Sequence, residues 1–278
     1  MAEKLHIEKN SVQATLLIPL YSRVQCTRLY PEIYSDPASE KALERIDYSF
    51  AESTDENSMT VRFGALEVAT RQSDIAIEVK NYLKRHPRAA VVNLGCGLDP
   101  MTEDLDNGTC RLYNIDLPDV IELRDQLFPA GEREESFAAD INDTAWFDRI
   151  DASGGAVFFA CGLFYYFKKD QVKALFTAMR DRFPGGCLVF DTAGKAALKM
   201  MVKGIIKDSA GIEAVDAYFH AGRPEADISP WLDGAKVTYK GYMLGYNGLK
   251  LPSVPRSLRL LAKVGDGLMK MKIVKIEF

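Results

Sequence analysis

The feature that most constrains the fold is a change of hydrophobic period near residue 89. A stretch over 170–183 has amphipathic helical spacing, and PGG follows it. Similar helical patterns separate five short apolar runs: AAVVNLG (89–95), RLYNIDL (111–117), SFAADI (136–141), AVFFACG (156–162) and CLVFDT (187–192). Strands that alternate with helices predict parallel βαβ units with right-handed crossovers and helices on both faces of one sheet.

The rest of the chain gives weaker signals. KVTYKGYM (236–243) and MKIVKIEF (271–278) are predicted strands, which makes seven in all. Beyond residue 193 we expect a helical region over roughly 195–221, a loop over 223–234 and a helix over 256–270. The segment before residue 89 is expected to be helical, notably over 35–46 and 59–86. We therefore predict an N-terminal helical extension or lid (1–88) packed on a main domain (89–278), together one structural unit.

Composition excludes several classes of function. Lys and Arg number 35, Asp and Glu number 39, and no basic cluster is present, which disfavours nucleic acid as a partner. No apolar run approaches the roughly 18 residues that span a bilayer, and the N-terminus lacks the apolar core of a signal peptide. The five cysteines include no CxxC pair and no metal-ligand spacing, so we expect free thiols, no metal and a cytoplasmic protein.

A turn with two glycines follows the first strand, in the stretch AVVNLGCGLDP (90–100). Gly95 and Gly97 would let a ligand approach the backbone, and either can adopt positive φ. Cys96 between them is interpreted as a small residue that fits the turn, not as a nucleophile. The dinucleotide fingerprint needs a third glycine where this chain has Pro100, so a cofactor with a pyrophosphate is disfavoured.

Acidic residues stand at the ends of the next two strands. Asp116, nineteen residues after Gly97, is placed to accept hydrogen bonds from ribose hydroxyls. Asp140 could bind an adenine amino group, with Ile141 beside the ring. Cys161 and Gly162 would face the same cleft from the fourth strand. Taken alone, each acidic residue could be only an N-cap for the next helix. Two acidic residues at the ends of successive strands, behind a turn with two glycines, favour S-adenosylmethionine over NAD as the ligand.

Four stretches carry a resemblance to a known family: VVNLGCGLDP, YNIDLPDVIELR, ADINDTAWFD and GLFYYFKKDQVKALF. They resemble the leucine carboxyl methyltransferase-like superfamily, and most closely its bacterial branch of tetracenomycin polyketide O-methyltransferase type. The resemblance runs from TLLIPLYSR to about residue 192. It implies a class I methyltransferase (Rossmann-like) fold, a mostly parallel seven-stranded sheet and S-adenosylmethionine as methyl donor.

The resemblance also implies roles for individual residues. An arginine ahead of the first strand pairs with the cofactor's carboxylate in the family, and Arg71 matches it; Arg23 is a weaker candidate for the same end. Leu117, next to Asp116, joins the predicted cofactor contacts. The family often has an acidic residue where this chain has Cys161, and cysteine is a poor replacement for a charge that reaches the cofactor's amino group.

The predicted activity is O-methylation of a small molecule, polyketide-like or another secondary metabolite, at a hydroxyl or carboxyl group. A carboxylate acceptor needs no base at neutral pH, whereas a phenol or enol benefits from one. Tyr165, Tyr166 and His220 are weak candidates for a base, and none is assigned. The helical segment from residue 1 to about 60 and the 195–235 region are expected to close the acceptor pocket. A few large side chains are its candidate lining: Met200, Met201, Tyr218, Phe219 and Trp231.

Two alternatives stay open at this point. One is a nicotinamide-dependent oxidoreductase on a Rossmann sheet, against which Pro100 argues. The other is a non-catalytic protein that binds S-adenosylmethionine, which Cys161 and the lack of an obvious base would allow. The sequence fixes neither the acceptor nor the oligomeric state.

Overall fold

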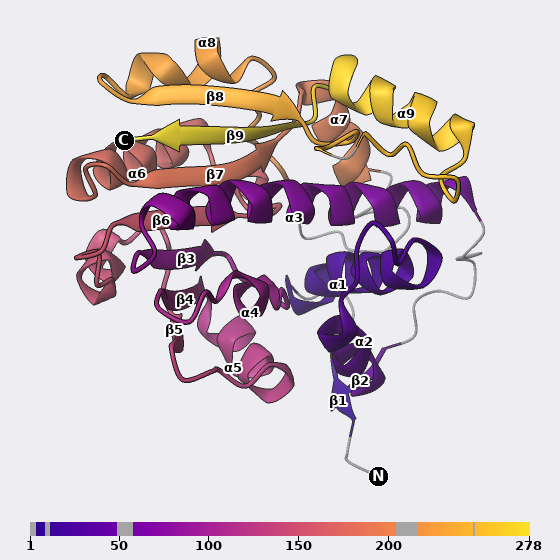
Figure 1. Ribbon diagram of the computed structural model, residues 1–278, viewed down its shortest axis with the longest axis horizontal. Helices are drawn as coiled ribbons and strands as arrows, with labels where there is room; N and C mark the ends of the chain where they lie inside the picture. The colour runs from indigo at the N-terminus through magenta and orange to yellow at the C-terminus, as the bar shows by residue number, and fades with distance from the viewer. Residues whose placement is uncertain (1–3, 9–11, 49–57, 204–215, 247) are drawn as a thin grey trace.

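A seven-stranded sheet forms the centre of the molecule (Figure 1). The computed structural model describes residues 4–8, 12–48, 58–203, 216–246 and 248–278. The sheet has the strand order β5-β4-β3-β6-β7-β9-β8. The strands are β3 (Ala90–Leu94), β4 (Arg111–Asp116), β5 (Glu134–Ala138), β6 (Ala156–Ala160), β7 (Cys187–Thr192), β8 (Lys236–Gly241) and β9 (Lys272–Glu277).

The seven strands are those expected from the sequence, with shifted bounds. The strands β3 to β7 pair in parallel, and β9 runs antiparallel to its neighbours β7 and β8. The largest shift concerns β5, which was predicted over 136–141 and lies at 134–138. Asp140 is therefore two residues beyond the strand. The chain leaves β3 toward β4 and β5 and later returns to β6, so the strand order reverses between β3 and β6.

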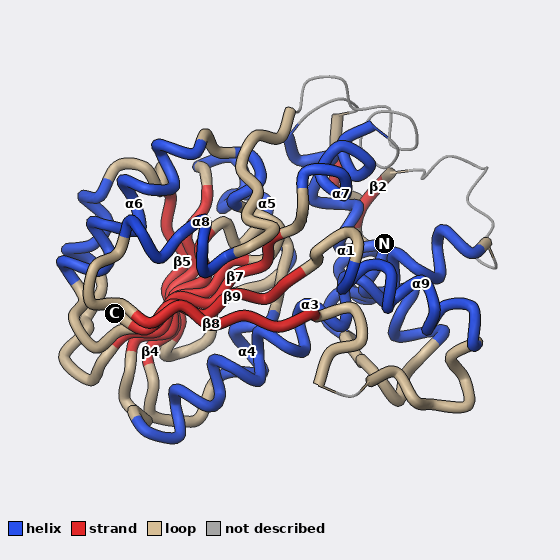
Figure 2. Tube along the Cα trace, turned by 90° about the horizontal axis from the view of Figure 1, so that it is seen from above, coloured by secondary structure: helices blue, strands red, loops and turns tan. Residues whose placement is uncertain are grey.

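Helices cover both faces of the sheet, because each central strand is apolar on both sides. Val172, Phe176 and Met179 of α6 (Lys169–Arg182) pack with Val92 of β3 on one face. The other face packs Val91 with α3 (Met59–Arg85), whose long buried stripe includes Ile75 and Val79. Figure 2 shows the sheet between these two layers. Ser58 begins α3 by accepting a hydrogen bond from the Val61 amide, as an N-cap does.

The N-terminal segment contributes two more helices and a small pair of strands. Helices α1 (Val12–Leu29) and α2 (Pro37–Glu44) pack together beside α3, and Asp36 caps α2. The short strands β1 (Leu5–His6) and β2 (Ile46–Asp47) pair in parallel and were not expected. Because α3 packs directly on β6, β7 and β9, part of the predicted extension belongs to the sheet's own layers. The division at residue 88 stays a prediction.

The region after β7 departs most from expectation. Of the helix predicted over 195–221, α7 (Lys195–Met200) is present, residues 204–215 lie outside the described part, and 216–221 are not helical. The predicted loop 223–234 contains α8 (Pro224–Ile228) and a 3₁₀ turn, η4 (Ser229–Trp231). Helix α9 (Arg256–Gly267) lies within its predicted range.

Short elements follow the strand ends and shape the region beyond them. They are α4 (Met101–Leu105), α5 (Pro118–Leu127) and the 3₁₀ turns η1 (Thr144–Arg149) and η2 (Phe164–Tyr166). The loop from β3 to α4 carries both glycines, and Pro100 is the N-cap of α4. Within the described ranges, no helix is both long and apolar enough to cross a bilayer.

Candidate functional site

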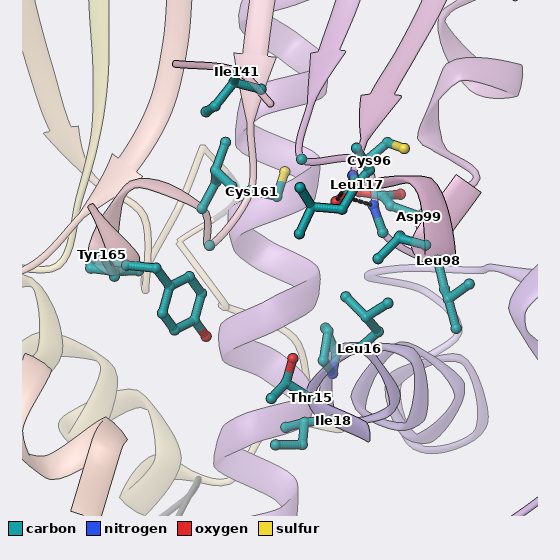
Figure 3. Close-up of a pocket in the computed structure, with 18 of the residues that line it drawn as sticks. Thr15, Leu16, Ile18, Cys96, Leu98, Asp99, Leu117, Ile141, Cys161 and Tyr165 are labelled. Atoms are coloured by element: carbon teal, nitrogen blue, oxygen red, sulfur yellow. Dashed lines mark hydrogen bonds between the residues drawn. The ribbon is translucent and has the colours of Figure 1, made fainter. Parts of the chain in front are cut away.

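A cavity of about 620 Å³ lies beyond the carboxyl ends of β3, β4, β5 and β6, at the reversal of strand order. This is where open α/β sheets bind their ligands, and the volume is typical of a small-molecule site. Figure 3 shows Ile141, Cys161, Leu98 and Tyr165 around it. All eleven residues predicted to contact the cofactor line this one cavity: Arg23, Arg71, Gly95, Cys96, Gly97, Asp116, Leu117, Asp140, Ile141, Cys161 and Gly162.

Both glycines of the first loop have the left-handed backbone that glycine tolerates best. Gly95 has φ +62° and Gly97 has φ +48°. A Cβ at Gly95 would overlap the side chain of Leu163, and a Cβ at Gly97 would lie 3.1 Å from Leu16. The expected positive φ is thus present at both glycines. The backbone and the Leu163 side chain already require glycine at position 95.

Gly95→Ala is expected to lower the free energy of unfolding by roughly 1–3 kcal/mol, the usual cost of a strained backbone. It should also weaken S-adenosylhomocysteine binding, because Leu163 must move at the cavity wall. Gly108→Ala is the matched control, since Gly108 has φ +83° but open space around it and no place in the lining. Chemical denaturation and calorimetry measure both effects. Equal affinity loss in the two variants would contradict this account.

Asp116 ends β4 and faces the glycine loop. Its Oδ2 accepts a hydrogen bond from the Gly97 amide (2.7 Å) and its Oδ1 accepts one from the Leu117 amide (2.8 Å). Burial raises the pKa of this carboxyl, while those two amides lower it. Each oxygen keeps a second lone pair, so the carboxylate can accept further hydrogen bonds from a ligand.

Two apolar side chains and one acidic group surround the part of the cavity beyond β4 and β5. Leu117 is 43% exposed and Ile141 is 5% exposed, and both line the cavity. Asp140 is exposed, and its Oδ1 accepts hydrogen bonds from the amide and the side chain of Asn142, at 2.9 Å each. An apolar slot with a carboxylate at its edge suits a flat heterocycle that carries an amino group.

Arg71 reaches the cavity from α3 and is held by a carboxylate behind it. Its Nη1 lies 3.2 Å from Asp191 Oδ2 and 3.6 Å from Glu67 Oε1. Asp191 also accepts hydrogen bonds from Tyr165 Oη (2.9 Å) and from the Gly162 amide (2.6 Å). Burial alone would lower the pKa of Arg71, but Asp191 and Glu67 raise it, and the net direction is upward. Arg71 therefore remains a cation.

Two buried arginines hold the carbonyls of the glycine loop. Arg124 of α5 donates from Nη1 to the carbonyl of Gly97 (3.2 Å) and to that of Asp99 (2.6 Å). Arg23 of α1 donates from Nη2 to the carbonyl of Leu98, between them. Three consecutive carbonyls are thus fixed from two sides. Their arginines are 1% exposed and come from elements far apart in the sequence.

The Nε side of the Arg23 guanidinium is also held by protein groups. Its Nε donates to Asp36 Oδ2 (3.0 Å) and to Ser39 Oγ (3.1 Å) at the start of α2. Asp99 of the loop accepts a hydrogen bond from Gln72 of α3 (2.7 Å). Helices α1, α2 and α3 therefore all reach the glycine loop through buried polar contacts. Arg23 lines the cavity but is bound chiefly by protein groups.

The cavity thiols are poor nucleophiles in this setting. Burial raises the pKa of Cys96, which is 2% exposed, and raises that of Cys161 as well. Cys96 donates its amide to the Ile115 carbonyl (3.1 Å), as a residue inside a tight turn can. Asp191, on the neighbouring strand, supplies a buried carboxylate beside Cys161, although Asp191 does not line the cavity.

The remaining candidates divide between cavity, core and surface. Tyr165 and Tyr166 line the cavity, whereas His220 is exposed and does not. Of the five expected lining residues from 195–235, Met201 and Tyr218 reach the cavity. The other three do not: Met200 is 62% exposed, Phe219 is in the core beside α6, and Trp231 is partly buried and packs against that core.

Sequence reasoning missed part of the lining. Glu67 lies one helical turn before Arg71, so the i, i+4 spacing could have indicated it. The remaining missed residues had no such signal. They come from α1, α3, α5, the strand-end loops and the stretch that begins at Asp216: Thr15, Leu16, Ile18, Pro19, Val68, Gln72, Leu98, Asp99, Val120, Ala139, Asn142, Leu163, Phe167 and Asp216. Within the described residues, no group of three or more His, Cys, Asp or Glu side chains could hold a metal ion.

Comparison with known proteins gives a consistent picture. The leucine carboxyl methyltransferase family matches residues 32–180, more than half of the chain. The tetracenomycin polyketide synthesis O-methyltransferase TcmP of Streptomyces glaucescens is 29% identical over 187 residues, which cover 66% of this chain and 67% of TcmP.

Solved structures resemble the chain over nearly its whole length. A proposed methyltransferase from Thermobifida fusca has a TM-score of 0.60 at 14% identity, covering 97% of this chain and 94% of that protein. The plantazolicin methyltransferase BamL has a TM-score of 0.51 at 14% identity, covering 96% and 99%. These likenesses confirm the class I methyltransferase fold.

The family match and the fold point to the same chemistry. They favour a methyltransferase over a nicotinamide-dependent oxidoreductase, and they confirm the predicted cofactor, S-adenosylmethionine. The chain therefore belongs to the leucine carboxyl methyltransferase family.

Proposed function

We propose that the protein is an S-adenosylmethionine-dependent O-methyltransferase that acts on a small molecule at a hydroxyl or carboxyl group. The observation that carries the proposal is that eleven residues, chosen for cofactor contact, surround one cavity at the strand-order reversal. The likeness to TcmP, named as an O-methyltransferase, favours oxygen as the methyl acceptor.

The residues present fit the cofactor. Arg71 Nε is buried and has no hydrogen-bond partner in the described structure, although the guanidinium lines the cavity. A carboxylate is the ligand that would satisfy such a donor. Leu117 is an exposed apolar side chain at the far wall, where the ring of an adenine would cover it. A charged end and an apolar end match the two ends of an aminoacyl nucleoside.

We assign the individual roles on this basis. Arg71 binds the carboxylate of the cofactor, and Asp116 accepts hydrogen bonds from the ribose hydroxyls. Leu117 and Ile141 enclose the adenine, and Asp140 accepts from its amino group. The loop containing Gly95, Cys96 and Gly97 lies along the ribose and methionine part, and Cys161 with Gly162 forms the opposite wall. Arg23 holds the loop through the Leu98 carbonyl and does not bind the cofactor carboxylate.

The protein's main catalytic task is alignment. The cofactor supplies an electrophilic methyl group on a sulfonium. Arg71 holds the carboxylate end of the cofactor, Ile141 and Asp140 hold the adenine end, and Asp116 with the clamped loop holds the middle, so the acceptor oxygen can approach in line. Such positioning can contribute roughly 7–11 kcal/mol to lowering a barrier. The apolar and aromatic side of the cavity excludes water from the reacting atoms.

Asp116→Ala is expected to weaken S-adenosylhomocysteine binding by roughly 1.5–3 kcal/mol, the range for hydrogen bonds to a charged group. Calorimetry measures the affinity directly. Asp181→Ala is the control, because Asp181 is exposed on α6, outside the cavity lining. Unchanged affinity in the Asp116 variant would remove this residue from the site.

The function itself is tested by methyl transfer. The protein is incubated with methyl-labelled S-adenosylmethionine and a panel of hydroxyl and carboxyl acceptors, and the label in the product is counted. We expect transfer to oxygen together with calorimetric binding of S-adenosylhomocysteine. Binding without transfer to any acceptor would instead favour a non-catalytic binding protein, and no binding at millimolar ligand would contradict both.

A further inference from the structure

Helix α9 carries apolar side chains on two of its sides. One side packs in the core through Leu258 and Ala262, each 1% exposed. The other side faces solvent and consists of four aliphatic side chains, called the α9 face below: Leu260 (65% exposed), Leu261 (39%), Val264 (37%) and Leu268 (79%). Leu260, Val264 and Leu268 follow one another at i, i+4 spacing, so their side chains are neighbours along the helix.

This concentration of exposed aliphatic side chains is unusual within the molecule. Of the exposed leucine, isoleucine and valine side chains among the described residues, only Leu117 lies outside the α9 face, and Leu117 lines the cavity. Single exposed apolar residues are ordinary on a protein surface, but a contiguous group marks a surface that contacts something else. The α9 face is therefore a candidate docking surface.

The chain around the α9 face is basic. Residues 248–272 contain a single acidic residue, Asp266, although the whole chain has a net charge of −4. The same stretch contains six basic residues, which are separated in sequence and form no basic run: Lys250, Arg256, Arg259, Lys263, Lys270 and Lys272. Asp266 is turned toward the protein, where it accepts hydrogen bonds from the amides of Met243 (2.8 Å) and Leu244 (3.1 Å).

Two of these basic residues stand directly beside the apolar stripe. Leu260 lies four residues after Arg256 and three before Lys263, so both cations are its neighbours on the helix surface. Both are exposed, and neither forms an ion pair with any of the described residues. The α9 face thus combines protruding aliphatic side chains with positive charge that the protein itself does not neutralise.

The α9 face lies at the end of the molecule that holds the cavity. The carbonyl of Met269, just past α9, accepts a hydrogen bond from the amide of Gly194, just past β7 (2.8 Å). Met271 and Met201 pack against the small apolar cluster that contains Tyr165, and both Met201 and Tyr165 line the cavity. Figure 1 shows α9 and α7 at the same end of the sheet as α1.

A bilayer with anionic headgroups fits these features better than a protein partner does. An amphipathic helix binds such a surface by burying aliphatic side chains at headgroup level while its Lys and Arg side chains approach the phosphates. A second copy docked by a two-fold contact would bring Arg256 and Lys263 of both copies together, and like charges oppose each other. The centres of protein interfaces also favour aromatic and methionine side chains, and the α9 face has none.

We propose that the protein docks on anionic lipid membranes through the α9 face. Helix α9 lies in the plane of the membrane surface, with Leu260 and Leu268 among the acyl chains and with Arg256 and Lys263 at the headgroup phosphates. Its twelve residues are too few to span a bilayer, so docking is peripheral. One short helix binds weakly, so the apolar and the charged contacts must act together and the docking is reversible.

Co-sedimentation of the full-length protein with lipid vesicles tests the docking. Vesicles of phosphatidylcholine are compared with vesicles that also contain phosphatidylglycerol. We expect binding to the anionic vesicles and much weaker binding to phosphatidylcholine alone. Raising the salt concentration should release the protein, because salt screens the attraction between the basic residues and the headgroups. Absence of binding to the anionic vesicles, or binding that ignores lipid charge, would overturn the proposal.

Two double variants test the two kinds of contact. Leu260→Ser combined with Leu268→Ser should lower partitioning onto the anionic vesicles roughly 10-fold or more, because less apolar surface is buried. Arg256→Gln combined with Lys263→Gln should lower it by a similar factor, because each cation near an anionic surface contributes to binding. All four side chains are exposed, so both variants should keep the circular dichroism spectrum of the unmodified protein. Unchanged partitioning in either variant would contradict the assignment of the α9 face.

A matched control removes two exposed lysines from the opposite end of the molecule. Lys80 and Lys84 lie one turn apart near the end of α3, which leads into the start of β3. Lys80→Gln combined with Lys84→Gln should leave vesicle binding unchanged, and a loss equal to that of the Arg256 and Lys263 variant would mean a general effect of net charge. Sedimentation equilibrium tests the other occupant. A dimer that the Leu260 and Leu268 variant converts to a monomer would assign the α9 face to a second copy and overturn the proposal.

Discussion

Arg71→Met is expected to weaken S-adenosylhomocysteine binding by about 2–5 kcal/mol, or roughly 30-fold or more, as calorimetry would show. Removing one member of a buried charge pair generally has an effect of this size. Arg71 is 8% exposed, and its Nε lacks a partner that a ligand carboxylate would supply. The methionine side chain fills similar space but offers no donor to that carboxylate.

Methylthioadenosine separates this effect from general damage to the fold. It shares the adenosyl part of S-adenosylhomocysteine but has no amino-acid carboxylate. The Arg71 variant should therefore bind methylthioadenosine nearly as well as the unmodified protein does. The S-adenosylhomocysteine affinity of Arg71→Lys should lie between those of the unmodified protein and of Arg71→Met, since lysine keeps the charge but loses the planar fork. Equal loss for both ligands would mean that Arg71 acts only through Asp191 and the cavity wall.

The sheet and the cofactor half of the cavity could be predicted because both follow local rules. Period-2 and buried apolar runs such as 156–162 give strands directly, and parallel strands bring their carboxyl ends to one edge. Residues at or just past those ends, such as Asp116 and Gly95, must then lie near each other. The prediction tolerated errors in strand bounds: β5 ends before its predicted limit, yet Asp140 still lines the cavity.

The side chains that hold the cavity lining from behind, Asp191 and Arg124, could not be predicted in this way. Asp191 reads in sequence as part of an apolar strand, and only the pairing of β6 with β7 brings it to Gly162. Arg124 stands in a helix with ordinary amphipathic spacing, and nothing local indicates that it crosses to the Asp99 carbonyl. Contacts between elements distant in sequence depend on how the layers pack, which no periodicity encodes.

The region expected to close the acceptor pocket illustrates the same limit. Aromatic and methionine residues over 200–231 were candidates as a group, because composition does not distinguish a core side chain from a cavity wall. Phe219 packs in the core while its neighbour Tyr218 lines the cavity. The amides of both residues donate to the Tyr165 carbonyl, at 3.2 Å and 2.7 Å, so the chain is held at this point and the two adjacent side chains lie on opposite sides of it.

Arg124→Met should lower the free energy of unfolding by about 3–5 kcal/mol, the usual result of breaking a buried ion pair. Arg124 Nη2 lies 3.7 Å from Glu134 Oε1, and both side chains are nearly inaccessible. Without Arg124, the Glu134 carboxylate keeps only neutral donors, such as Asn114 (2.5 Å) and Thr102 (2.6 Å). Arg28→Met is the control: its ion pair with Glu40 is exposed, so its loss should change stability by no more than about 1 kcal/mol.

A double variant separates the burial of a charge from the positioning of the loop. Combining Arg124→Met with Glu134→Gln removes the unpaired carboxylate, so much of the lost stability should return in chemical denaturation. The carbonyls of Gly97 and Asp99 still lack their donor, so S-adenosylhomocysteine affinity should stay low. Recovery of affinity together with stability would contradict the role of Arg124 in positioning the loop. Persistent weak binding in a stable protein would establish that the clamp on three consecutive carbonyls holds the cofactor loop in its binding conformation.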